Sequence, residues 1–132
     1  MFETVNWLAV TVAALATFVI GGPWYSPALF RNRWQREMGV TDMKPGHPLR
    51  VFGLAYLFSL IATACLAAVL GPEANAVSGL KVGAIVGACF VATSFGVNYQ
   101  FANRSFAVLL IDGGYHIVQF AAFGLVLGAW PG

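Results

Sequence analysis

The chain has 132 residues, of which 59% are hydrophobic and 9% are charged, and its formal net charge is +2. In soluble domains about a quarter of the residues are charged, so this composition excludes an ordinary soluble domain. Outside its long apolar stretches the chain has too few residues for a nucleotide-binding loop, a dinucleotide fold or a zinc motif. We therefore expect an integral membrane protein, with no cofactor and no nucleic-acid partner.

Long uncharged stretches divide the chain into four apolar segments. Residues 4–30, 51–72 and 82–103 contain no Asp, Glu, Lys or Arg, and Asp112 is the one such residue in 105–132. A membrane-spanning helix needs about 20 apolar residues. The sequence therefore predicts an all-α fold, a polytopic membrane protein with one four-helix transmembrane domain over 1–132 and spans at about 4–22, 52–71, 79–101 and 106–128.

The first ten residues carry Glu3 and neither Lys nor Arg. A cleaved signal peptide begins with a basic region, so we expect the first helix to be kept as a span. Cleavage after the "ALA" that ends at Ala16 is the alternative. Cys65 and Cys89 fall inside predicted spans, where free cysteines pack as small buried apolar residues. Two cysteines without clustered histidines give no metal-binding spacing.

The basic residues predict an orientation. Those between the first two spans and Arg104 share one membrane face, whereas Lys81 alone lies on the other. Cytoplasmic loops carry the excess of Lys and Arg. We therefore expect residues 23–51 in the cytoplasm, both termini outside, and location in the cell inner membrane. The strong bias disfavours an antiparallel dual-topology dimer. Aromatic residues fit two interfacial belts: Trp7 and Trp130 outside, and Trp24, Tyr25, Tyr56 and Tyr99 inside.

A short amphipathic helix is predicted at about 27–38. Ser26 suits an N-cap, Pro27 the first helical position and Gly39 the C-terminal stop. Apolar side chains recur every fourth residue, and arginines occupy the other faces. We expect this helix to lie among anionic lipid headgroups; a docking surface for a partner protein is the alternative. The residues assigned to this interface are Trp24, Tyr25, Phe30, Arg31, Arg33, Trp34 and Arg36.

Two sequence motifs resemble a known family. "GGPWYSPALFRNRW" at 21–34 and the later "DGGYH" at 112–116 are similar to motifs of an uncharacterised bacterial and fungal family of small four-helix membrane proteins, the domain of unknown function 1761. The first motif is carried by Trp24, Tyr25, Ser26, Phe30 and Trp34, and the second by Tyr115 and His116. The resemblance covers nearly the whole chain. It implies the four-helix topology and supplies neither a substrate nor a mechanism.

Small residues repeat along the third span. Gly79, Gly83 and Gly87 recur every four residues, and Ala88, Ala92 and Gly96 form a neighbouring stripe. Small residues at this spacing let two helices in lipid approach closely. The fourth span adds Gly124 and Gly128. These faces fit packing within the bundle, but two stripes exceed what one neighbour needs, so we expect a homo-oligomer or a subunit of a larger membrane complex.

The fourth span also carries a polar face. Asp112, Tyr115, His116 and Gln119 follow the i, i+3, i+4, i+7 spacing of one helix face, and Gly113 and Gly114 leave room beside it. A charge within a span costs about 2.5–3.5 kcal/mol on insertion scales. We therefore expect the carboxyl group to be neutral, paired with His116, or served by Asn98 or Arg104. We expect both Asp112 and His116 to face the bundle interior.

Three classes of function remain from these observations. The first is a structural or accessory subunit, in which the polar face only joins helices. The second is a proton-coupled transporter or channel in which Asp112 and His116 titrate as a pair, although the sequence shows no inverted repeat and no broken span. The third is an intramembrane enzyme, disfavoured because there is no second carboxylate, no metal set and no cysteine with a partner. We expect the first class and no catalytic residue.

Overall fold

The computed structural model describes residues 1–40 and 46–131, and this part of the chain is helical without any strand. Four segments are long and apolar enough to cross a membrane: Trp7–Trp24, Pro48–Leu70, Ala76–Phe101 and Phe106–Ala129. The all-helical prediction is confirmed, with limits within four residues of those expected. The helices are α1 (Trp7–Ala14), α2 (Ala16–Trp24), α3 (Arg31–Met38), α4 (Pro48–Leu70), α5 (Ala76–Val86), the π-helical turn η1 (Gly87–Val91), α6 (Ala92–Phe101) and α7 (Phe106–Ala129).

Local sequence accounts for most of the helix ends. Asn75 and Ser78 form a reciprocal capping box at the start of α5, and the Ser105 hydroxyl caps α7 by accepting from Val108 N. Gly39 ends α3 in the left-handed conformation (φ 73°), as predicted. The start of α3 was predicted wrongly: residues 27–30 form turns, and the Ser26 hydroxyl donates to the Pro23 carbonyl rather than capping a helix.

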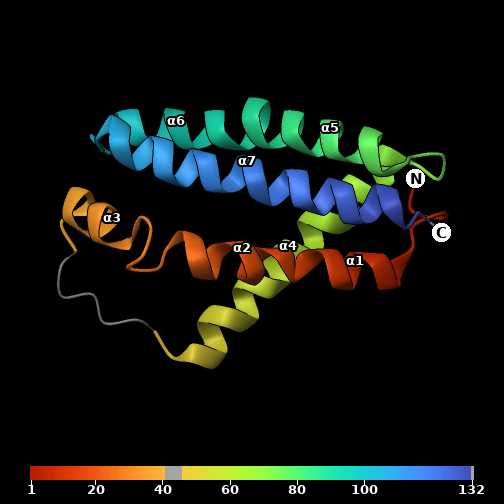
Figure 1. Cartoon of the computed structure of the whole chain (residues 1–132), viewed down its shortest axis with the longest axis horizontal. Helices are drawn as coiled ribbons and strands as arrows, with labels where there is room; N and C mark the ends of the chain where they lie inside the picture. Colours follow the sequence, from red (N-terminus) through yellow and green to blue (C-terminus); the bar gives the residue numbers. More distant parts are fainter. Residues whose placement is uncertain (41–45, 132) are drawn as a thin grey trace.

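Figure 1 shows how the long segments lie together. The helical segments α5–η1–α6 and α7 run side by side in opposite directions, α1 and α2 lie along the other side of α7, and α4 crosses them obliquely. Both termini and the α4–α5 connection lie at one end, whereas α3 and the α6–α7 turn lie at the other. The two ends of α7 therefore meet different neighbours.

Glycines set the distance between α5 and α7. A Cβ atom added at Gly79 would overlap the Gly124 carbonyl, and one added at Gly83 would overlap the Phe120 carbonyl. Gly87 meets His116 and its neighbour Ile117, and Gly128 meets the Asn75 carbonyl. The backbones are in contact because these residues have no side chain, which is how small residues join helices in lipid. The predicted stripe of Gly79, Gly83 and Gly87 is therefore covered inside this chain by the face that holds Gly124 and Gly128.

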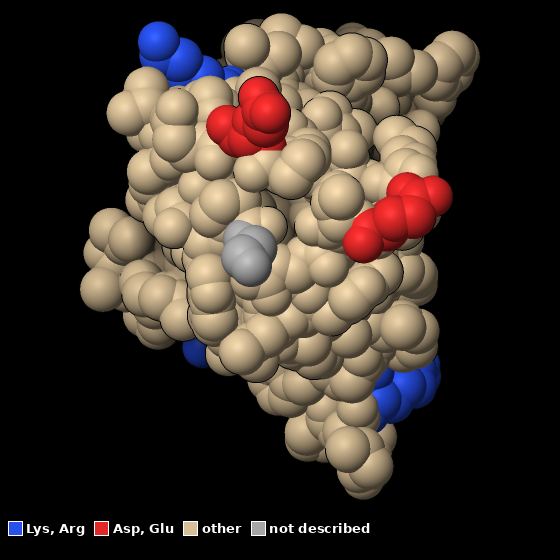
Figure 2. Space-filling view, turned by 90° about the vertical axis from the view of Figure 1, so that its right-hand side faces the viewer, with Lys and Arg blue, Asp and Glu red and all other residues tan. Residues whose placement is uncertain are grey.

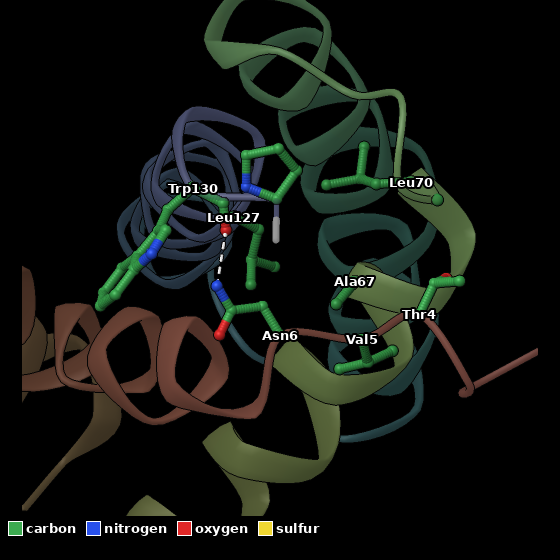
Figure 3. Close-up of a pocket in the computed structure, with 9 residues that line it drawn as sticks. Thr4, Val5, Asn6, Ala67, Leu70, Leu127 and Trp130 are labelled. Atoms are coloured by element: carbon green, nitrogen blue, oxygen red, sulfur yellow. Dashed lines mark hydrogen bonds between the residues drawn. The ribbon is translucent and has the colours of Figure 1, made fainter.

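The apolar core lies at the end that holds the termini. Ala9, Val10 and Ala13 of α1 pack with Leu66 of α4 and with buried residues of α7, Phe123 and Leu127. The Asn6 side chain accepts from Ala9 N at 3.2 Å, which caps α1, and donates to the Trp130 carbonyl at 3.3 Å (Figure 3). The start and the end of the described chain are thereby joined beside this core.

Charge is distributed unevenly between the two ends. Figure 2 views the end that carries the termini, where two separate acidic groups are in view and the basic side chains in view lie at the edges. Glu3 and Glu73 belong to the segments at this end. The opposite end carries α3, with its exposed arginines, and the α6–α7 turn, which contains Arg104. Lys44, also expected there, lies outside the described residues.

Candidate functional site

Asp112 lies at the centre of the first of two hydrogen-bond networks along α7. Its side chain is buried, with 5% of the residue exposed. Oδ1 accepts from the Tyr25 hydroxyl at 2.6 Å and from Trp34 Nε1 at 3.0 Å, and Oδ2 accepts from the Tyr99 hydroxyl. We call these four side chains the Asp112 cluster. Hydrogen bonds to a carboxylate are stronger than those between neutral groups, so this cluster is a strong local tie.

Three separate segments deliver the donors of the Asp112 cluster. Tyr25 directly follows α2, Trp34 lies in the middle of α3 and Tyr99 lies near the end of α6. Trp34 also meets the Tyr25 ring edge to face, with ring centroids 6.1 Å apart. The cluster therefore ties α2, α3 and α6 to one residue of α7.

Trp24 secures the same region through the backbone of α7. Its Nε1 donates to the Ile111 carbonyl at 3.0 Å, and its ring packs against Phe30 with centroids 5.0 Å apart. A Cβ atom added at Gly114 would lie 3.1 Å from the Trp24 ring. The space that the sequence predicted beside Gly114 is therefore occupied by an indole of the same chain.

These contacts correct several predictions. Trp24, Tyr25 and Trp34 were assigned to a lipid-facing interface, and Tyr99 to an aromatic belt, but their polar groups hydrogen-bond α7. Phe30, assigned to the same interface, packs against Trp24. The helix at 31–38 is present, but its Trp34 points into the bundle; the arginines, Arg31, Arg33 and Arg36, are exposed as expected.

The expected partners of Asp112 were also wrong. Asn98 is exposed, and Arg104 is exposed and donates to the Met38 carbonyl at 3.1 Å. Among the described residues, the ion pairs are those of Glu3 with the N-terminal amine and of Arg33 with Glu37, so no cation pairs with Asp112. Burial, and then the hydrogen bond to Asp112, raise the pKa of Tyr25 above its usual range. Tyr25 thus remains a hydroxyl donor at physiological pH.

The second network starts at His116, four residues along α7. His116 Nδ1 lies 2.6 Å from Gln119 Oε1, Gln119 Nε2 donates to Thr17 Oγ1 at 2.8 Å, and Thr17 Oγ1 lies 2.6 Å from Ser59 Oγ. Ser59 donates in turn to the Ala55 carbonyl at 2.8 Å. We call this series the His116 chain. It connects α7 with α2 and α4.

Tyr115 stands between the two networks. Its hydroxyl donates to the Thr17 carbonyl at 2.8 Å, and its ring meets those of Tyr25 and His116 edge to face. No hydrogen bond joins Asp112 to His116 in the described part of the chain. The single polar face predicted from the sequence is therefore divided between two sets of partners.

The His116 chain borders a cavity of about 280 Å³ between α2, α4, η1 and α7. Its polar wall is formed by Thr17, Ser59, Tyr115, His116 and Gln119, while Phe58 and Phe120 give aromatic surface beside the fully buried Phe123. None of the described residues that line it is charged. The π-helical turn η1 contributes Val91, and Gly87 at its start contacts the His116 backbone. Such turns are often found at functional sites, and no residue pattern predicted this one.

The second small-residue stripe has a different environment from the first. Ala88, Ala92 and Gly96 line a groove of about 550 Å³ that is open to the surface between α6 and α7. Gly113 lies on the opposite wall, and the lining is almost wholly apolar. Cys65 and Cys89 are exposed, which corrects their predicted burial. Among the described residues no three His, Cys, Asp or Glu side chains are grouped to hold a metal.

Comparison with known proteins identifies one family. The sequence profile described as "Protein of unknown function (DUF1761)" matches residues 8–128, which covers both networks and all but the two outermost residues of the four long helical segments. No curated protein and no solved structure matches the chain. Because the match extends over nearly the whole sequence, the resemblance noted from its two motifs is confirmed, and the chain belongs to the DUF1761 family.

Proposed function

We propose that the protein is a structural or accessory component of the inner membrane, in which the Asp112 cluster holds α3 across the cytoplasmic end of the bundle. The observation that carries this proposal is the set of three hydrogen bonds that Asp112 accepts from Tyr25, Trp34 and Tyr99. They use the carboxylate to join segments rather than to face a cavity. The role is non-catalytic.

The consequence of this arrangement is a fixed basic surface. With Trp34 turned toward α7, the exposed side chains Arg31, Arg33 and Arg36 lie on the remaining faces of α3. Basic residues beside a membrane are attracted to anionic lipid, with about 1 kcal/mol for each Lys or Arg near the surface. The Asp112 cluster thus supports an arginine surface that contacts anionic headgroups at the cytoplasmic face.

Lipid composition tests this proposal. The full chain is placed in nanodiscs of phosphatidylcholine, with or without phosphatidylglycerol, and its thermal unfolding midpoint is measured. The anionic lipid should raise the midpoint of the wild type, and the triple variant Arg31→Gln, Arg33→Gln, Arg36→Gln should lose this rise. Lys81→Gln, an exposed charge on α5 near the other end, is the matched control and should keep it. Equal midpoints of the wild type in both lipids would contradict the proposal.

Self-association belongs to the same proposal and uses the open groove. Gly79, Gly83 and Gly87 are covered by α7, so the remaining small-residue surface is the stripe of Ala88, Ala92 and Gly96. A second copy packed there would complete the accessory role that the sequence suggested. Light scattering in detergent should show an oligomer for the wild type and a monomer for Gly96→Leu. A monomeric wild type would remove this part of the proposal.

Proton-coupled transport is the second candidate, because His116 lines a cavity. No hydrogen bond joins His116 to Asp112 among the described residues, which weighs against a pair that titrates together. Proteoliposomes with a pH-sensitive dye inside and an imposed membrane potential distinguish the two functions. The structural role predicts no proton flux above that of protein-free liposomes. A flux that Asp112→Asn abolishes would instead establish transport.

A further inference from the structure

The His116 chain has one nitrogen that the protein does not use. His116 Nε2 makes no hydrogen bond to any described residue. No described side-chain nitrogen or oxygen is both fully buried and without a partner. Nε2 therefore has open space beside it, and His116 is among the residues that line the cavity of about 280 Å³.

The direction of the chain sets the chemistry of this nitrogen. Ser59 directs its hydrogen to the Ala55 carbonyl, so Thr17 must donate to Ser59, and Gln119 Nε2 then donates to Thr17. This leaves Gln119 Oε1 facing His116 Nδ1, and a carbonyl oxygen can only accept. With these directions, each of the four hydrogen bonds from His116 to the Ala55 carbonyl has one donor and one acceptor. Nδ1 therefore carries the hydrogen, and Nε2 of the neutral imidazole is an acceptor.

The ring that holds this acceptor is fixed in position. His116 stacks on Phe95 with centroids 4.8 Å apart and an interplanar angle of 19°, and Tyr115 meets it edge to face. The hydrogen bond to Gln119 prevents rotation of the imidazole without loss of that contact. A ligand would therefore meet an acceptor that is already oriented, which lowers the entropy cost of binding.

The size and walls of the cavity select the rest of the ligand. A cavity of about 150 Å³ is enough to hold benzene, so about 280 Å³ accommodates one substituted ring. Phe58 and Phe120 supply flat apolar walls, and the described lining residues include no charged one to balance an ion. His116 is the eleventh of the 24 residues of α7, about 15 Å along the helix. A ligand that enters at this depth comes from the lipid and is neutral.

We infer that this cavity binds the ring of a neutral, lipophilic phenol, whose hydroxyl donates to His116 Nε2. The phenol ring lies against Phe120, and its apolar substituent leaves the cavity beside the exposed Phe58. This binding site is independent of the Asp112 cluster and of α3.

A pair of probes that differ in one hydrogen-bond donor tests the inference. The full chain in nanodiscs is titrated with 4-octylphenol and, separately, with its methyl ether 4-octylanisole, and affinities are obtained from the shift of the unfolding midpoint. The phenol should bind about tenfold more tightly than the ether, because the ether cannot donate to Nε2. Equal affinities would mean that the cavity only takes apolar chains, such as those of lipids, and would overturn the inference.

Two further measurements make the assignment specific to His116. His116→Phe should abolish the preference for the phenol, whereas His47→Phe, a change of the other histidine of the chain, should retain it. In the wild type labelled with ¹⁵N-histidine, the phenol should shift the Nε2 resonance of His116 and the ether should not. This NMR result does not depend on the folding of a variant. An unmoved resonance at saturating phenol would contradict the inference.

Discussion

From Phe120 onward α7 packs against α5 by backbone contact, whereas the part of α7 before Phe120 is tied to α2, α3 and α6 by side-chain hydrogen bonds and to α4 through Thr17. The first part depends on the absence of atoms at Gly79, Gly83 and Gly124. The second depends on the presence of acceptors and donors that match. The part of α7 from Phe120 onward should therefore be sensitive to added side-chain volume, and the part before Phe120 to the loss of a polar group.

The largest effect is expected where a shared acceptor is removed. Asp112→Leu leaves Tyr25, Trp34 and Tyr99 without their acceptor, and each unsatisfied donor costs about 1–3 kcal/mol. We expect the free energy of unfolding in detergent to fall by about 4 kcal/mol, after partial rearrangement of the donors. Val118→Leu places a leucine on an exposed face of the same helix and should be near neutral. A wild-type unfolding midpoint for Asp112→Leu would show that the cluster does not hold the fold.

Added volume between α5 and α7 should have the next largest effect. In Gly83→Ala the new Cβ overlaps the Phe120 carbonyl, so the two helices must separate. Overpacking of this kind costs about 3 kcal/mol. Gly53→Ala is the matched control, because its Cβ meets nothing within 4 Å on the exposed face of α4. Chemical unfolding of both variants checks the difference. Equal free energies of unfolding would contradict the claim that close backbone contact at Gly83 stabilises the packing of α5 on α7.

A smaller difference in unfolding free energy is expected between the loss of a hydrogen bond to a carboxylate and the loss of one to a backbone carbonyl. Tyr25→Phe removes one of the two hydrogen bonds to Asp112 Oδ1, with an expected loss of about 2 kcal/mol. Tyr56→Phe removes a hydrogen bond of 2.8 Å to the Thr11 carbonyl and should cost about 1 kcal/mol. The two free energies of unfolding are measured under identical conditions. A larger loss for Tyr56→Phe would contradict the special role of Asp112.

Much of the fold could be predicted because apolar length and glycine spacing are local signals. The four long segments, the stop at Gly39 and the close contact at Gly83 follow from residue types and their positions in the chain. These features can be predicted without knowing which helices are neighbours, except that a glycine face must pack on some partner. From the sequence that partner could be α7 or a second copy of the chain.

The partners in the candidate site could not be predicted because they depend on how the bundle turns each aromatic residue. Trp and Tyr near span ends are typical of lipid interfaces, and the same positions allow Tyr25 and Trp34 to reach Asp112. Thr17 and Ser59 are single hydroxyls in apolar spans, and only the crossing of α4 over α2 brings them together. The burial of Asp112 followed from cost alone; its donors required the tertiary structure.

The smallest change at Asp112 gives the most direct test of the proposal that it holds α3. In Asp112→Asn, Oδ1 still accepts from Tyr25 and Trp34, and the new amide nitrogen donates to the Tyr99 hydroxyl, which also accepts. We expect a loss of less than about 1 kcal/mol. Spin labels are placed at the exposed positions Asn32 on α3 and Leu110 on α7, in a Cys65→Ser, Cys89→Ser background.

The measurement is the distribution of distances between these two labels in Asp112→Asn and in Asp112→Leu. The account predicts that the asparagine variant keeps the single narrow distribution of the wild type, because α3 is still held, and that the leucine variant gives a broad one while the four long helices persist. A narrow, wild-type distribution in Asp112→Leu would contradict the central claim, since α3 would then be held without Asp112.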